Sequence, residues 1–186
     1  MPSRAVQLGI ALLVLSFSGC GKLLTQMILG SPPAGEAAKQ GELVDRTRFE
    51  GGEVDYELGP LPDHWEPEEV EAGDAFFFTP QYGATVATRS ICNRYTDSPL
   101  SRLARDLLGG VTERKILREE TLPFAGREAF DLVADGKIDG VPVRVWVRVL
   151  KKNRCIFDFT LVAPPGTFEA AQADFQGFLN GFKTRD

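Results

Sequence analysis

One alternating segment near the C-terminal end of the chain constrains its fold more than any other feature. Its two faces differ in composition: one carries Val143, Val145, Val147 and Val149, and the other carries Arg144, Trp146, Arg148 and Leu150. Alternation with a period of two is typical of a β-strand. A short polar turn at 151–154 and a second apolar run at 155–162 follow, so the sequence predicts an antiparallel hairpin.

Five shorter segments complete a set of about six or seven expected strands. They cover residues 54–58, 76–78, 84–92, 113–122 and 127–134. The segments 76–78 and 84–92 follow each other closely enough to form a second hairpin. The segment 113–122 is rich in charged residues, which favours an edge position, because charges there discourage pairing with other chains.

Two amphipathic helices are expected to cover this sheet. Their apolar residues recur at helical spacing, as Leu100, Leu103, Ala104, Leu107 and Leu108 in the first and Phe168, Ala171, Phe175, Phe178 and Phe182 in the second. Ser98 and Thr167 are suitable N-caps. Mostly antiparallel strands with two flanking helices predict an α+β fold.

The first 20 residues indicate where the protein is located. Arg4 precedes an apolar stretch from Val6 to Phe17, and two small residues stand directly before Cys20. A basic start, a short apolar core and a small-residue cleavage site are typical of an export signal. With a cysteine at this point the segment resembles the lipobox of bacterial lipoproteins, although Phe17 stands where that family prefers leucine.

This resemblance implies cleavage after residue 19 and attachment of a lipid to Cys20. Gly21 replaces the aspartate that retains enterobacterial lipoproteins in the inner membrane, which favours the outer membrane, facing the periplasm, in a Gram-negative host. Two alternatives stay open: an uncleaved membrane helix over 6–29, which would have to bury Lys22, and an ordinary secretory signal in which Cys20 is incidental. All three place the rest of the chain outside the cytoplasm.

The remaining sequence predicts a tether and one globular domain. Removing residues 1–19 takes away one of 21 basic residues and none of 26 acidic ones, so the net charge changes from −5 to about −6. Without a basic cluster, nucleic-acid binding is disfavoured. The segment 20–52 is rich in glycine, proline and polar residues, so it is expected to be a lipidated, flexible tether with a root-mean-square span of about 30 Å. Residues 53–186 are expected to form the domain.

Cys92 and Cys155 are the two cysteines that remain if Cys20 carries a lipid. An even number of cysteines outside the cytoplasm favours a disulfide. The alternative is a pair of buried free thiols that pack as small apolar side chains.

Three further groups are candidates for chemistry or binding. His64 is the only histidine; it is interpreted as a capping or packing residue rather than a general base, and a Cys-His nucleophile pair with Cys92 or Cys155 is disfavoured.

The acidic segment 66–74 is interpreted as a solvated charge run, because its spacing matches no calcium loop, and no metal site is expected. The face with Arg144, Trp146 and Arg148 is a possible partner surface; the alternative places Trp146 beneath a helix with the arginines paired at its rim.

The order of motifs along the chain resembles PsbP-like domains, including the DcrB-like lipoproteins. The resemblance rests on Leu61-Pro62 followed by Trp65, on the segment 124–129, on the Asp139-Gly140 turn and on a final helix that ends at Gly181-Phe182. It implies an antiparallel sheet sandwiched between helices and a binding or assembly role. The family has no catalytic residue to transfer to this chain.

These features together predict a membrane-anchored lipoprotein of the bacterial envelope that acts as a non-catalytic binding or assembly module. No cofactor is expected. Its expected partners are the membrane, through the lipid on Cys20, and another envelope protein. An envelope hydrolase with an unrecognised active site and a purely structural or stress-related lipoprotein are the alternatives.

Overall fold

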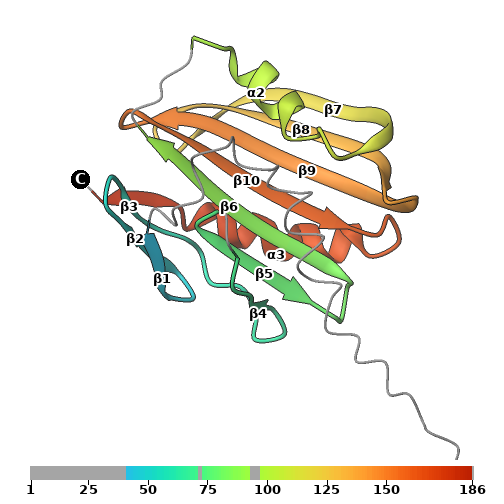
Figure 1. Cartoon of the computed structure of the whole chain (residues 1–186), viewed down its shortest axis with the longest axis horizontal. Helices are drawn as coiled ribbons and strands as arrows, with labels where there is room; N and C mark the ends of the chain where they lie inside the picture. The colour runs from blue at the N-terminus through green and yellow to red at the C-terminus, as the bar shows by residue number, and fades with distance from the viewer. Residues whose placement is uncertain (1–40, 71–72, 93–96, 186) are drawn as a thin grey trace, which may run out of the picture.

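A computed structural model describes residues 41–70, 73–92 and 97–185, and its centre is a seven-stranded antiparallel sheet (Figure 1). The strands follow the spatial order β4-β5-β6-β10-β9-β8-β7. Their bounds are β4 Glu66–Pro67, β5 Ala75–Thr79, β6 Ala84–Cys92, β7 Thr112–Phe124, β8 Arg127–Ile138, β9 Val141–Lys152 and β10 Cys155–Ala163. The α+β architecture expected from the sequence is confirmed, including both hairpins and the edge position of the charged strand β7.

Tight turns set the register of the long strands β7 to β10. Positive φ angles occur at Ala125, Asp139, Asn153 and Arg154 between these strands. Two-residue turns with positive φ angles match the right-handed twist of paired strands. The resulting register places Val149 of β9 opposite Asp158 of β10 and Asp131 of β8 opposite Arg148 of β9.

Helix α3, Phe168–Asn180, covers one face of the sheet. Its buried residues are four of the five in the predicted stripe, Phe168, Ala171, Phe175 and Phe178, together with Leu179. The fifth, Phe182, is also buried but lies beyond the end of the helix. They pack with Trp146, Phe157, Phe159 and Leu161 of the sheet in one apolar cluster. The apolar side of the helix, set by its 3.6-residue period, therefore packs on the apolar face of the sheet, set by the two-residue period of the strands.

Helix α2, Leu100–Asp106, lies on the opposite face, over β8 and β9. Ala104 and Leu108 pack there against the valines of β9, which all point to this side. The helix is shorter than the sequence suggested, because regular helix ends at Asp106, three residues before the predicted glycine stop. Ser98 does not cap it: Pro99 occupies the N-cap position and provides no side-chain hydrogen bond.

A second, four-stranded sheet lies beside the first and corrects the predicted tether. Its strands are β1 Gly41–Asp45, β2 Arg48–Gly51, β3 Asp55–Glu57 and β11 Lys183–Arg185, in the order β1-β2-β3-β11. Residues 41–52 were expected to be flexible, yet Phe49 is buried in the core, and Arg46 donates hydrogen bonds to the carbonyl oxygens of Pro62 (3.1 Å) and Trp65 (2.7 Å). The folded region therefore includes residue 41.

Candidate functional site

The two cysteines expected to pair do form a disulfide. Cys92 at the end of β6 lies directly opposite Cys155 at the start of β10, and their sulfur atoms are bonded. Both residues are buried in the cluster beneath α3. Cys20, the predicted lipidation site, lies outside the described residues.

His64 lies where α3 meets the loop before β4. Its Nε2 atom is 3.3 Å from Oδ2 of Asp174 on α3, and the indole nitrogen of Trp65 donates to the same oxygen at 2.9 Å. The imidazole also meets the Tyr82 ring edge to face, with 5.1 Å between centroids. Because Cys92 and Cys155 are bonded to each other, neither supplies a thiolate to His64, and the histidine serves as a packing contact.

Arg144, Trp146 and Arg148 do not form an exposed surface, which corrects the partner surface considered from the sequence. Trp146 is buried beneath α3, with its ring edge to face against Phe175 at 5.1 Å. Arg148 is 4% exposed, and its guanidinium lies over the Phe124 ring at 4.6 Å. The alternative interpretation, a tryptophan beneath a helix with paired arginines beside it, describes the structure.

Each arginine binds a carboxylate on the neighbouring strand β8. Arg148 donates two hydrogen bonds to Asp131, at 2.6 and 2.7 Å, and Arg144 donates two to Asp135, at 2.7 and 3.1 Å. The bond from Arg144 lowers the pKa of Asp135. Neither aspartate was predicted from the sequence, although a signal was present: the two aspartates are four residues apart, and so are the two arginines, as pairing across an antiparallel hairpin requires.

Among the described residues of the acidic segment 66–74, Asp74 has a buried carboxylate. Asp74, at its end, accepts a hydrogen bond from the Tyr56 hydroxyl at 2.7 Å, and that hydroxyl lies 2.6 Å from the Thr88 hydroxyl. No group of three or more potential metal ligands occurs in the described parts of the chain. Asp74 therefore connects β5 to the second sheet through Tyr56 of β3.

Burial raises the pKa of Asp74 to about 6, and the hydrogen bond from Tyr56 partly opposes this effect. A carboxyl group with a higher pKa in the folded state stabilises the protein fully below its unfolded-state pKa of 3.8. That contribution is lost as the pH rises through about 6. The folded protein is thus expected to favour a protonated Asp74.

Replacing Asp74 with asparagine is expected to remove this pH dependence. Between pH 3.5 and pH 7, the unfolding free energy of the variant should rise relative to wild type by roughly 3 kcal/mol, the value of a shift of about two pKa units. Urea unfolding of both proteins across this range measures the difference. A constant difference between the two proteins would show that Asp74 titrates normally.

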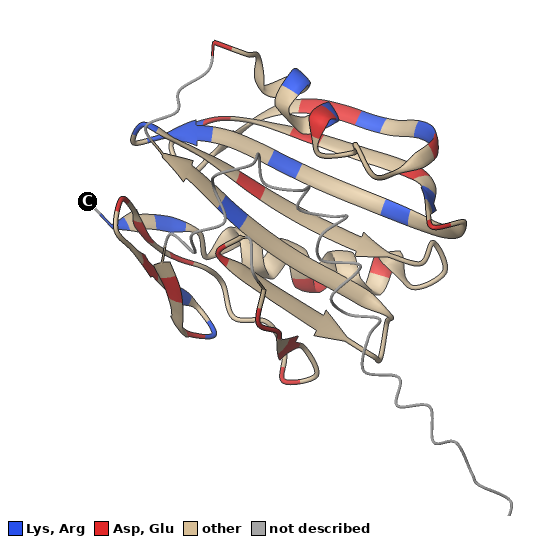
Figure 2. Cartoon of the chain, in the orientation of Figure 1, with Lys and Arg blue, Asp and Glu red and all other residues tan. Residues whose placement is uncertain are grey.

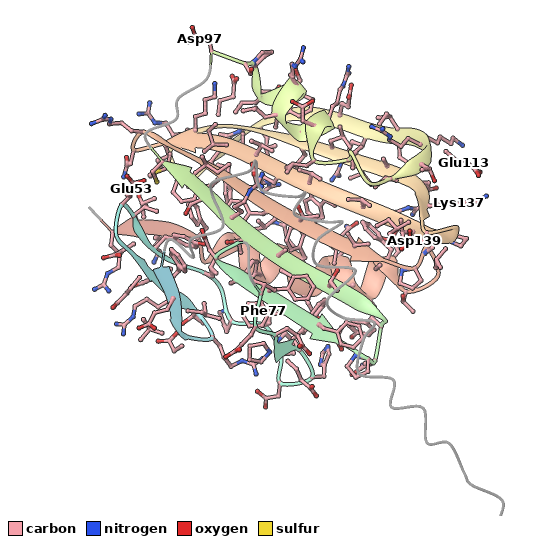
Figure 3. The ribbon with its side chains drawn as sticks, in the orientation of Figure 1. Glu53, Phe77, Asp97, Glu113, Lys137 and Asp139 are labelled. Carbon is pink, nitrogen blue, oxygen red and sulfur yellow. A yellow bond between two sulfur atoms is a disulfide. The ribbon has the colours of Figure 1, made fainter. Side chains whose placement is uncertain are left out.

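Strand β7 is the most exposed of the long strands of the main sheet. Every residue from Thr112 to Glu120 is exposed, and the apolar side chains of Ile116 and Leu117 remain 44% and 41% exposed. Figure 2 shows charges of both signs along the strand. Some of these charges are paired: Glu119 accepts two hydrogen bonds from Arg105 of α2, both at 2.9 Å, and Glu113 lies 2.8 Å from Lys137 of β8 (Figure 3).

We call Thr112–Thr121 the β7 edge. It pairs with β8 on one side only, so the backbone N–H and C=O groups of its other side are available to another strand. At its far end an open depression adjoins the hairpin turn and is lined by Thr121, Leu122, Pro123, Gly126, Arg127 and Glu128. The edge combines backbone hydrogen-bonding groups with two apolar side chains.

Comparisons with known proteins show a similarity of fold but not of sequence. No family model matches the sequence, and no curated protein matches it by sequence. LpqN of Mycobacterium tuberculosis, described as involved in cell envelope biogenesis, superimposes with a TM-score of 0.56 at 12% identity, over 78% of this chain and 88% of LpqN.

Two further solved structures share the arrangement. The cyanobacterial PsbP of Synechocystis gives a TM-score of 0.53 at 12% identity, over 83% of this chain and 100% of its own. The Ran-binding protein Mog1p of Saccharomyces cerevisiae gives 0.50 at 15% identity, over 71% and 90%. The chain therefore has a PsbP-like fold.

Proposed function

We propose that the chain is a lipid-anchored, non-catalytic module of the bacterial cell envelope that binds a protein partner at the β7 edge. The observation that carries the proposal is the exposure of this strand along both faces, with Ile116 and Leu117 among its charges. Strand addition at an open sheet edge is a common mode of recognition. The charges discourage indiscriminate pairing, so a partner must complement them.

Two features support an envelope location. The Cys92–Cys155 disulfide is a bond that persists in oxidising compartments, and the lipobox-like sequence at Cys20 offers a membrane anchor. LpqN, which shares the fold, is described as taking part in cell envelope biogenesis. The described residues contain no helix long and apolar enough to cross a bilayer.

Cross-linking in intact cells tests the proposed binding edge. A photoreactive amino acid at Leu117 is expected to form a reproducible adduct with one envelope protein. The same amino acid at Val44 is the control, because Val44 is 42% exposed, about the same as Leu117 at 41%, but lies on β1. Identical adducts at both positions, or no adduct at Leu117, would contradict binding at the β7 edge.

The anchor is tested separately by metabolic labelling with palmitate. Wild-type protein is expected to incorporate the label and to sediment with membranes, whereas Cys20→Ala should lose both properties completely. Cys92→Ala with Cys155→Ala is the control and should keep the label. Incorporation that persists in Cys20→Ala would exclude Cys20 as the lipidated residue.

A further inference from the structure

The face of the main sheet that carries α2 has two halves. α2 packs on β8 and β9, and Figure 1 shows it over that side of the sheet, away from β5. The other half consists of β5, β6 and β10, and it presents apolar side chains to the same side: Phe76, Phe78, Ala87 and Val162. We call these four residues the β5–β10 apolar strip.

The strip is buried more deeply than α2 alone explains. Phe76 is 2% exposed, Ala87 is 1% exposed and Val162 is 5% exposed, whereas Phe78 is half-buried. The described apolar side chains from outside the sheet that pack on this face are those of α2, those of Leu107, Leu108 and Val111 after it, and that of Val70 before β5. The Arg89–Asp158 ion pair, 2.9 Å long, belongs to the same half, and the Asp158 side chain is only 6% exposed. Burial of this extent on a sheet face requires another covering element.

The chain itself contains a segment of matching character before β1. Leu23, Leu24, Met27 and Ile28 follow the spacing i, i+1, i+4 and i+5, which places them on one side of a helix, with Thr25 and Gln26 on the other. Eleven residues lie between Leu29 and Gly41, the first residue of β1, and this connection can span up to about 40 Å. β1 lies on the side of the molecule away from α2 (Figure 1), so the segment reaches the strip without crossing α2.

We infer that residues 23–29 pack on the β5–β10 apolar strip as an amphipathic segment that completes the cover begun by α2. The alternative is that the apolar side chains of this segment lie on the surface of the bilayer, where they also lose contact with water. The two differ in consequence. Docking leaves only Gly21 and Lys22 between Cys20 and the docked segment, and so holds the domain close to its anchor. The inference does not depend on a partner at the β7 edge.

Cysteine cross-linking in the mature chain, residues 20–186 with Cys20→Ser, tests the docking. Ala87→Cys is combined in turn with a single cysteine at each of positions 23–28, and disulfide formation under mild oxidation is followed by mass spectrometry. At least one of the cysteines at 23, 24, 27 and 28 is expected to form the disulfide at least tenfold faster than the cysteines at 25 and 26. Leu117→Cys in place of Ala87→Cys is the matched control and should give uniformly slow reaction.

Vesicles of phosphatidylethanolamine and phosphatidylglycerol distinguish the two occupants. If the segment docks, the cross-linking rates stay the same when vesicles are added. Equal rates at all six positions, or a preference that vesicles abolish while the protein sediments with them, would overturn the inference. Deletion of residues 21–34 provides a second measurement: it should raise hydrogen exchange in β6 and β10 at least tenfold, and unchanged exchange there would contradict docking.

Discussion

Replacement of Arg148 by methionine is expected to lower the unfolding free energy by about 3–5 kcal/mol, because it leaves the buried carboxylate of Asp131 without its bidentate partner. The Asp131 side chain is 2% exposed and the Arg148 side chain 5% exposed. Arg118 lies 3.8 Å from Asp131 but is 44% exposed, so it compensates weakly. Such a loss is a large part of the 5–15 kcal/mol typical of a domain.

Arg144→Met is the matched control for this experiment. Both arginines lie on β9 and bind an aspartate on β8 through two hydrogen bonds, but the Arg144 and Asp135 side chains are 24% and 34% exposed. Water therefore solvates Asp135 after the change, and the expected loss is below about 1 kcal/mol. Equal losses in the two variants, measured by chemical denaturation, would show that burial does not decide the value of these pairs.

A double replacement separates the cost of an unpaired charge from the value of the pair. Asp131→Val with Arg148→Met removes both charges and leaves apolar side chains in their place. Replacing a buried ion pair by apolar residues is often neutral, so the double variant should recover to within about 1 kcal/mol of wild type. A double variant no more stable than Arg148→Met alone would mean that the ion pair itself stabilises the fold.

Removal of the disulfide is expected to cost about 4 kcal/mol. Cys92 and Cys155 are separated by 63 residues, and a cross-link over a loop of this length reduces the entropy of the unfolded chain by about that amount. The double variant Cys92→Ala, Cys155→Ala should therefore unfold roughly 8–16 °C lower than wild type. Calorimetry measures the difference.

Reduction of the wild-type protein provides the control for that prediction. Wild type in reducing buffer should approach the melting temperature of the double variant, whereas the variant itself should be insensitive to the reductant. An equal effect of reductant on both proteins would point to a cause other than the bond. A double variant as stable as wild type would show that the paired strands β6 and β10 do not need the cross-link.

Local patterns in the sequence predicted the central sheet well, because strand alternation and helical stripes repeat over many residues. The valines of β9 and the phenylalanines of α3 each form a long regular series, and both series are buried as expected. Charge on β7 was also informative, since an interior strand would have to bury it. These elements are determined by residues close together in the chain.

The sequence was less informative where the partner of an element lies far away in the chain. β1 and β2 are short and polar, and they form part of a sheet that β11, at the C-terminal end, completes through β3. The exposure of Trp146 likewise depended on α3, which follows it by more than 20 residues. The Arg148–Asp131 pair was recognisable only after β8 and β9 had been placed in register.

The order of strands in the second sheet determines how the domain would respond to mechanical load. Gly41 begins β1, the outermost strand, which pairs antiparallel with β2 from Gly41 opposite Gly51 to Asp45 opposite Arg48. A pull on Gly41 away from the domain would break these backbone bonds one after another, as in a zip, rather than all at once. The β1–β2 hairpin would open first and add extended chain between the point of pulling and the domain. Little force would therefore reach the aromatic core until that added chain is fully stretched.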